Sequence, residues 1–247
     1  MMCLNMASYG RFAGTVAVLL GAMCLTELAC ASDKSATISR FRWETNTIPV
    51  CWENPLPDDA PQRELVRQAV SMTWEKYSAV RLVGWQACEP NQRAIWIRAG
   101  DKEWPRAQIG KTALGTSPTM FLNHHPSRHP AFSGCAGRDN ECVQRIGVHE
   151  FGHALGLIHE QDRPDNSAEC EQSLSKDQIS LDFRSDPGLV LLSVYDKDSI
   201  MNYCNRASWG KPMEQLLGPG DIEGIGKLFA PRRAASLEDL PKILWRK

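Results

Sequence analysis

Five residues at fixed spacings constrain this chain more than any other feature: His149, Glu150, His153, Gly156 and His159. In a helix, residues four apart emerge about 40° apart around the axis and about 6 Å along it. The rings of His149 and His153 can therefore hold one metal ion. Glu150 lies about 60° further round, on the flank of the same face, where it can reach a water at the metal without becoming a ligand. The spacing predicts a metal site with a general base beside it.

His159 shows that the helix must end before it. In a continuous helix this residue would point about 240° away from His153 and lie about 9 Å further along the axis. The chain therefore has to leave the helix, and Gly156 can adopt the left-handed conformation that such an exit requires. Three imidazoles suit one Zn²⁺ ion, and a fourth position open to water is typical of a catalytic site.

Charge and composition exclude one broad class of function. The 247 residues carry 28 Lys and Arg against 29 Asp and Glu, a net charge of −1. A protein that binds nucleic acid through electrostatics carries a strong excess of basic residues, so we expect no nucleic-acid partner. The length favours one domain with a sizeable core.

The first 31 residues are typical of a secretory signal peptide. Arg11 precedes an apolar run over residues 12–25, and Ala29-Cys30-Ala31 has the small-x-small pattern of a cleavage site. A buried N-terminal helix in a cytosolic protein and a lipid anchor at Cys30 are the alternatives. The apolar run over residues 189–194 is too short to span a bilayer. We expect a secreted or periplasmic protein with no integral membrane segment after signal removal.

Removal of residues 1–31 leaves six of the nine cysteines. An even number in an exported chain predicts three disulfides, for which 15 pairings are possible. Their order in the sequence favours Cys51–Cys88, Cys135–Cys142 and Cys170–Cys204.

Hydrophobic periodicity predicts a mixed sheet with helices packed on it. Short strands are expected at 48–52, 81–85, 94–98 and 119–123, the last as a sheet edge that could pair with an extended substrate. Apolar residues recur at helical spacing after Asp59 and again over 142–158, which predicts two helices. A short helix capped by Asp221 is expected over 221–229.

The chain divides into one main domain flanked by shorter segments. Residues 32–40 are expected to form a loose N-terminal segment, 41–230 the catalytic domain and 231–247 a surface tail. His124, His125 and His129 lie in a Pro-rich stretch whose spacing fits no regular ligand geometry, so a solvated loop is favoured over a second metal site.

The pattern H-E-x-x-H-x-x-G-x-x-H over residues 149–159 resembles the zinc motif of the metzincin peptidases. The continuation EQDRPD at 160–165 resembles the astacin family in particular. The segment YDKDSIMNY at 195–203 resembles that family's methionine turn, and the resemblance as a whole runs from about Phe41 to Phe229.

The resemblance implies a fold and an activity. The implied fold is the α+β metzincin catalytic domain: a twisted mixed β-sheet with two long helices in the N-terminal half, an irregular C-terminal half ending in a helix, and an active-site cleft between them. Met201 matches the methionine beneath the zinc, where we expect packing only. Tyr203 matches a further zinc ligand that swings away during catalysis, which would let it stabilise the oxyanion.

Two features depart from the family's pattern. Asn202 stands where a histidine that is not a ligand is usual, and no pro-segment aspartate is recognisable before the domain. The resemblance also implies that the mature N-terminus folds inward to meet Glu160.

The sequence therefore predicts a secreted zinc endopeptidase, acting as a monomer on protein or peptide substrates. His149, His153 and His159 would bind one zinc ion, with Glu150 as general base toward metal-activated water and Tyr203 as a further catalytic residue. Two alternatives remain: a secreted protein that binds zinc without cleaving a partner, and a disulfide-rich adhesion or inhibitor module. The bonds cleaved are not predicted, although walls of a specificity pocket are expected between residues 165 and 217.

Overall fold

The structure is a computed structural model and describes residues 35–101, 104–205 and 211–230. The predicted signal peptide over 1–31 and the tail over 231–247 lie outside the described residues.

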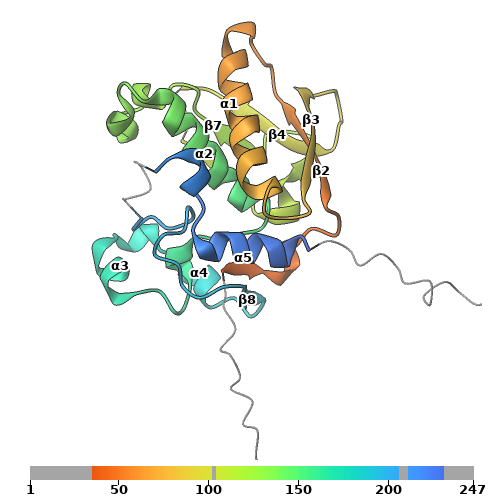
Figure 1. Cartoon of the computed structure of the whole chain (residues 1–247). Helices are drawn as coiled ribbons and strands as arrows, with labels where there is room; N and C mark the ends of the chain where they lie inside the picture. Colours follow the sequence, from red (N-terminus) through yellow and green to blue (C-terminus); the bar gives the residue numbers. More distant parts are fainter. Residues whose placement is uncertain (1–34, 102–103, 206–210, 231–247) are drawn as a thin grey trace, which may run out of the picture. The chain divides into compact units, whose positions relative to one another are not determined.

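The first half of the described chain contains a mixed β-sheet (Figure 1). Its strands follow the order β3-β2-β4-β7-β5, and β6 pairs with β4. Strands β2, β3, β4 and β7 are parallel to one another, whereas β5 runs antiparallel to β7 and β6 antiparallel to β4. The bounds are β2 Thr47–Trp52, β3 Arg81–Ala87, β4 Ala94–Ala99, β5 Arg106–Ala107, β6 Leu114–Gly115 and β7 Met120–Leu122.

The four predicted strands are present, but the predicted sheet edge is wrong. Strand β7 is hydrogen-bonded to β4 on one side and to β5 on the other, so it lies inside the sheet. The edge on this side of the sheet is β5, a strand of two residues that is too short to give a period-2 signal in the sequence.

Two long helices pack against each other beside this sheet (Figure 1). Helix α1, Ala60–Val70, continues into a π-helical turn over Ser71–Glu75, and α2 spans Asp139–Ala154. Apolar residues of α1 recur on one buried face and end at Trp74, which is fully buried. The indole Nε1 of Trp74 donates a hydrogen bond to the Val148 carbonyl oxygen at 2.8 Å, which joins the end of α1 to the middle of α2.

The second half of the chain is irregular, as the family resemblance implies. It contains α3 Ala168–Ser173, α4 Leu181–Arg184, β8 Leu189–Leu191 and α5 Pro219–Leu228. Short 3-10 helices occur along the described chain at Ser39–Phe41, Pro57–Asp59, Gly110–Ala113, Pro126–Arg128, Pro130–Cys135, Glu160–Asp162, Lys176–Gln178 and Met213–Gln215.

Helix α5 begins two residues earlier than predicted, and Asp221 is not its N-cap. Gly218 precedes the helix and Pro219 occupies the first position, where a missing amide hydrogen is harmless. Asp221 lies inside the first turn and accepts a hydrogen bond from the Gly218 amide at 2.8 Å. The Asp221 carboxylate therefore accepts from the amide of the residue that precedes the helix, although Asp221 itself lies in the first turn.

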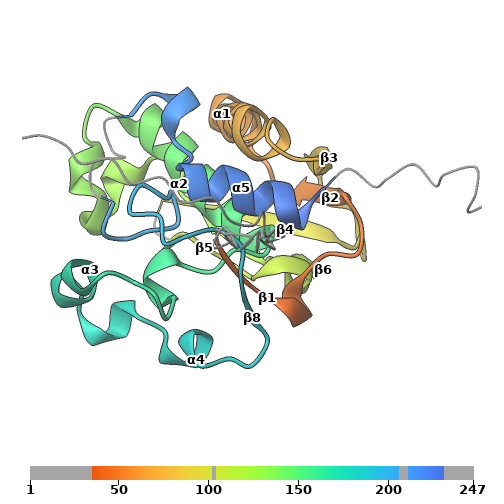
Figure 2. The ribbon, with the colours of Figure 1, turned by 60° about the horizontal axis from the view of Figure 1, so that its bottom comes forward.

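The N-terminal segment is not loose. Strand β1, Ala36–Ile38, is buried and pairs antiparallel with β8, and Figure 2 shows the two strands side by side. Thr37 also donates a hydrogen bond to the Gly156 carbonyl oxygen at 2.6 Å. The prediction of a loose segment failed for residues 35–40 because three residues are too few for a periodic signal, although Ala36 and Ile38 fill the core.

All three predicted disulfides are present. Cys51–Cys88 links β2 to the end of β3, and Cys135–Cys142 closes the entry to α2. Cys170–Cys204 joins α3 to the segment that follows Met201.

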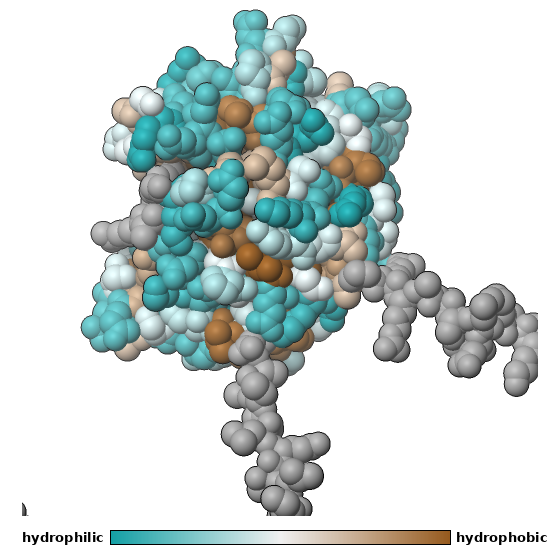
Figure 3. Space-filling model, in the orientation of Figure 1, coloured by the Kyte–Doolittle hydropathy of each residue, from teal (hydrophilic) through white to brown (hydrophobic). Residues whose placement is uncertain are grey.

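No helix among the described residues has the length and apolar character needed to cross a membrane. On the face shown in Figure 3, hydrophobic residues form small separate groups among hydrophilic ones.

Candidate metal centre and cleft

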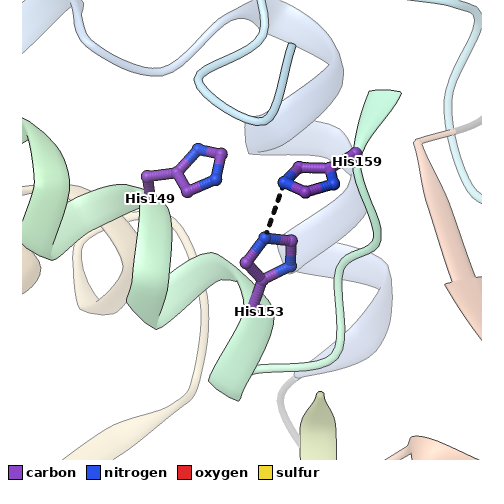
Figure 4. A group of neighbouring side chains, drawn as sticks. All are labelled: His149, His153 and His159. Atoms are coloured by element: carbon purple, nitrogen blue, oxygen red, sulfur yellow. Dashed lines mark hydrogen bonds between the residues drawn. The ribbon is translucent and has the colours of Figure 1, made fainter. Parts of the chain in front are cut away.

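Three histidines converge at the end of α2 (Figure 4). His149 and His153 project from successive turns of the helix, which ends at Ala154. Gly156, at φ +111°, turns the chain back, and His159 approaches from the loop that follows. One ligand nitrogen from each ring lies within 4.8 Å of the other two, and the Nε2 atoms of His153 and His159 are 3.0 Å apart.

Backbone carbonyl groups fix the orientation of the His149 and His153 rings. The Nδ1 of His149 lies 2.8 Å from the Ile200 carbonyl oxygen, and the Nδ1 of His153 lies 2.9 Å from that of Leu157. Because a carbonyl oxygen can only accept, each of these Nδ1 atoms carries the proton and each Nε2 keeps its lone pair. The Nδ1 of His159 lies 3.6 Å from a carboxylate oxygen of Asp162.

This donor set fits a zinc ion. The Nε2 atoms of His153 and His159, 3.0 Å apart, are close enough to bind the same ion. Burial lowers the pKa of His149 to about 3, with a further contribution from the charge of His159, and burial likewise lowers the pKa of His153 well below its usual value. The buried rings are therefore neutral at physiological pH, the form that binds a metal. Ring nitrogens oriented by carbonyl partners are typical of zinc centres.

Glu150 places a carboxylate beside the histidines. Its side chain is buried, yet it lines the cleft, and its Oε2 has no hydrogen-bond partner among the described residues. Burial raises the pKa of Glu150 to about 8, and the charge of Arg106 opposes this rise. A buried carboxylate with a free oxygen facing a cleft is equipped to exchange a proton with a bound molecule.

Tyr203 lies against the histidines and belongs to the segment that follows Met201. Its ring centroid is 4.3 Å from that of His159 and 6.0 Å from that of His149. Burial, followed by the charges of Glu150 and Asp162, raises the pKa of Tyr203 to about 12, so the hydroxyl keeps its proton at neutral pH.

Met201 packs beneath α2, as predicted. It is buried, and a Cβ added to Gly152 would overlap its Sδ. The glycine is therefore required for the helix to approach the methionine this closely.

Buried charges hold the loop after the third histidine. Glu160 accepts a hydrogen bond from the Asp196 amide at 2.7 Å and lies 3.2 Å from the guanidinium of Arg163. Among the described residues Glu160 therefore interacts with its own loop and with the segment that contains Asp196, and the expected contact with a mature N-terminus stays a prediction.

A cleft of about 270 Å³ opens beside the histidines. One wall matches the predicted region, because Gln178, Ile200, Asn202, Tyr203 and Asn205 line it. The other wall was missed: it consists of Trp104, Pro105, Phe132, Arg145 and Ile146. Arg145 could have been found, because it precedes His149 by four residues and so shares its helix face. Trp104 and Phe132 carry no such signal.

The second group of histidines is only partly as predicted. His124 is buried, with its ring centroid 5.9 Å from that of Trp52, so the expectation of a solvated loop is wrong for this residue. His125 and His129 instead contact Asp101 and Trp104. Within the described residues, the group that could hold a metal is the one formed by His149, His153 and His159.

Part of the chain is similar to the astacin peptidases. Residues 138–243 match the family model described as Astacin, a family of peptidases. The structure resembles that of myroilysin, with a TM-score of 0.57 and 19% sequence identity over 80% of this chain and 100% of that one. This likeness shows that the two chains share a fold.

Two relatives are similar in sequence. Zinc metalloproteinase nas-30 of Caenorhabditis elegans is 28% identical over 181 residues, which is 70% of this chain and 20% of the relative. Human Tolloid-like protein 1 is 34% identical over 101 residues, which is 38% of this chain and 10% of the relative. The chain thus spans a fifth or less of the length of these two relatives.

Proposed function

We propose that this chain is a zinc-dependent endopeptidase that hydrolyses peptide bonds of protein substrates. The observation that carries this proposal is the buried Glu150 carboxylate, with a free oxygen, beside three converging histidines. The astacin-like sequence and fold support the same reaction.

The three histidines would hold one zinc ion through their Nε2 atoms. When bound, such an ion polarises the scissile carbonyl and lowers the pKa of a coordinated water to near 7. In its ionised form, Glu150 accepts a proton from the attacking water at Oε2 and passes it to the leaving amine, a contribution of about 10²- to 10⁴-fold in rate. Tyr203 donates its hydroxyl hydrogen to the developing oxyanion, which requires the protonated form that it retains.

Hydrolysis of casein or gelatin by wild type and Glu150→Gln tests the proposal. The amide has the size of the carboxylate but cannot take up the proton, so we expect at least about a 10²-fold loss of rate with zinc content unchanged. A chelator should abolish wild-type activity, and added zinc should restore it. Equal activity of the two proteins, or activity that survives chelation, would exclude the mechanism. Zinc binding without cleavage would favour the non-proteolytic alternative.

Compartment and organisation are part of the same proposal. Three disulfides favour an oxidising compartment, in agreement with secretion or periplasmic export after removal of residues 1–31. We propose residues 41–230 as the peptidase domain, with β1 packed onto it, acting as a monomer. N-terminal sequencing of the exported protein and its sedimentation in solution test these points.

A further inference from the structure

The turn between α2 and the third histidine decides where two of the proposed zinc ligands lie (Figure 4). Helix α2 ends at Ala154, and residues 155–158, which we call the exit turn, lead to His159. The carbonyl oxygen of Leu157, within the exit turn, lies 2.9 Å from the Nδ1 of His153 and orients its ring. A displacement of the exit turn would therefore move both ligands, His153 through this carbonyl group and His159 through the chain itself.

Strand β1 holds the exit turn from outside. The Oγ1 of Thr37 donates a hydrogen bond to the Gly156 carbonyl oxygen at 2.6 Å, and the Ile158 amide donates to the Ala36 carbonyl oxygen at 3.1 Å. Between them, Leu157 forms an antiparallel bridge with Thr37. Strand β1 therefore fixes the residues on both sides of the carbonyl group that orients the histidine ring.

The hydroxyl of Thr37 makes a contact that water cannot replace. Thr37 is completely buried, so loss of its hydroxyl would leave the Gly156 carbonyl oxygen without this donor in a place where solvent does not reach it. The Leu157 amide, in contrast, donates within the same part of the chain, to the Gly152 carbonyl oxygen at 3.0 Å. The exit turn thus supplies one of its own hydrogen bonds and takes others from β1.

A second contact reaches the end of α2 from the segment that follows β1. The indole Nε1 of Trp43 donates a hydrogen bond to the Ala154 carbonyl oxygen at 2.8 Å. The last carbonyl groups of a helix have no partner within the helix, and donors from elsewhere satisfy them. Because α2 carries His149 and His153, this bond ties the helix end that presents both ligands to the N-terminal segment.

We propose that Thr37 and Trp43 are positioning residues for the zinc site, which hold the exit turn so that His153 and His159 face the same ion before it binds. The inference rests on the proposed zinc site, and the two contacts span 119 and 111 residues of sequence. Groups that orient a ligand contribute about 10- to 100-fold in metal affinity. If the exit turn leaves this position, the apparent affinity falls with the fraction of molecules whose ligands are aligned.

Thr37→Val tests the proposal, because valine has the shape of threonine without the hydroxyl. We expect the zinc affinity, measured by competition with a chromophoric chelator, to fall about tenfold or more. Thr37→Ser keeps the hydroxyl and should bind zinc within about threefold of wild type. In the Co²⁺-loaded proteins, the visible absorption bands report the arrangement of the ligands. These bands should change in Thr37→Val and return in Thr37→Ser.

Thr73→Val is the matched control. Thr73 is also buried, and its Oγ1 donates to the Ala69 carbonyl oxygen at 2.6 Å, but this bond lies within α1 and its π-helical continuation. The denaturant midpoints of the two metal-free valine variants should fall by comparable amounts, whereas the zinc affinity should fall in Thr37→Val alone. Equal zinc affinities of the two variants would show that the Thr37 contact serves stability only, and the proposal for Thr37 would be wrong.

Trp43→Phe gives a second test, which also decides if Thr37→Val does not fold. Phenylalanine keeps an aromatic ring but lacks the N–H group. We expect a smaller fall in zinc affinity, of at least about threefold, because water can partly replace a half-buried donor. In metal-free protein, exchange of the Ile158 amide hydrogen should be about tenfold faster in Thr37→Val than in wild type. Wild-type zinc affinity in Trp43→Phe would exclude its positioning role.

Failure of this inference can be told from failure of the proposed function. Zinc affinity, Co²⁺ spectra and amide exchange need no substrate, whereas the peptidase proposal stands or falls on cleavage. A wild-type protein that binds zinc and cleaves nothing would refute the peptidase function, and the zinc affinities of the variants would still decide the role of the N-terminal segment. Wild-type zinc affinity and wild-type Ile158 exchange in Thr37→Val, beside normal cleavage, would overturn the positioning role alone.

Discussion

The backbone carbonyl oxygen of Ile200 lies 2.8 Å from the Nδ1 of His149. The amide of the same residue donates a hydrogen bond of 2.8 Å to an oxygen of Asp221, on α5. The backbone of one residue therefore connects a carboxylate of the last described helix to one of the three histidines. Partners of this kind orient a metal ligand without touching the metal.

Asp221→Ala should weaken zinc binding by roughly 10- to 100-fold, because the Ile200 backbone loses the acceptor that holds it. Asp221→Asn should retain most of the affinity, since one amide oxygen can still accept from Ile200. Competition with a chromophoric chelator measures both. Glu223→Gln, on the same helix and paired with Lys227, is the control. Wild-type affinity in Asp221→Ala would show that the connection does not matter.

Gly152→Ala should destabilise the fold by about 1–3 kcal/mol, because the new methyl group overlaps the Met201 side chain. The cost should shrink in the Gly152→Ala/Met201→Ala double variant relative to the sum of the single changes, since the smaller residue makes room. Denaturant unfolding of the four proteins measures this. Gly134→Ala, where no atom lies within 4 Å of the added Cβ, should be neutral, and strict additivity of the pair would contradict the packing argument.

The disulfides should differ in what they contribute to stability. Cys170–Cys204 and Cys51–Cys88 join residues 34 and 37 apart in the sequence, whereas Cys135–Cys142 joins residues 7 apart. Loop-closure entropy then gives about 4 kcal/mol for each long loop and about 2.5 kcal/mol for the short one. Replacing each pair by serines and measuring denaturant midpoints tests the order. A larger loss at the short loop would indicate that chain entropy does not dominate.

His124 should make the fold sensitive to mild acid. Burial lowers its pKa below the usual 6.5, although nearby Asp59 opposes the shift. The unfolded chain therefore takes up the proton first as the pH falls, so the contribution is complete above about pH 6.5 and declines below it. Unfolding free energies from pH 8 to 5 should fall more steeply for wild type than for His124→Gln. His129→Gln serves as the control, and parallel curves for wild type and His124→Gln would refute the assignment.

Long periodic elements and the zinc motif could be predicted because each depends on local spacing. The helical repeat fixes how His149, Glu150 and His153 face one another, and Gly156 marks the exit from the helix. The disulfide pairing could be predicted from sequence order because each of the three bonds joins two cysteines that are consecutive among the six.

Other features depend on contacts between distant segments and left no local signal. Strand β5 is two residues long, and its place at the sheet edge depends on pairing with β7. Trp104 and Phe132 reach the cleft through the path of their loops. Asp221 was expected to cap its helix by position, but Pro219 shifted the start of the helix and left the carboxylate to serve several partners.

The pairing of β1 with β8 also bears on how the chain acquires its structure. Ala36 lies opposite Leu191, so one of the first described residues finds its partner only after most of the domain has been synthesised. Contacts between residues so far apart in sequence carry a large loop-closure cost and slow folding. Thr37 also forms a bridge with Leu157, which emerges earlier, but during synthesis the edge of β1 that pairs with β8 stays without its partner until the segment beyond α4 has emerged.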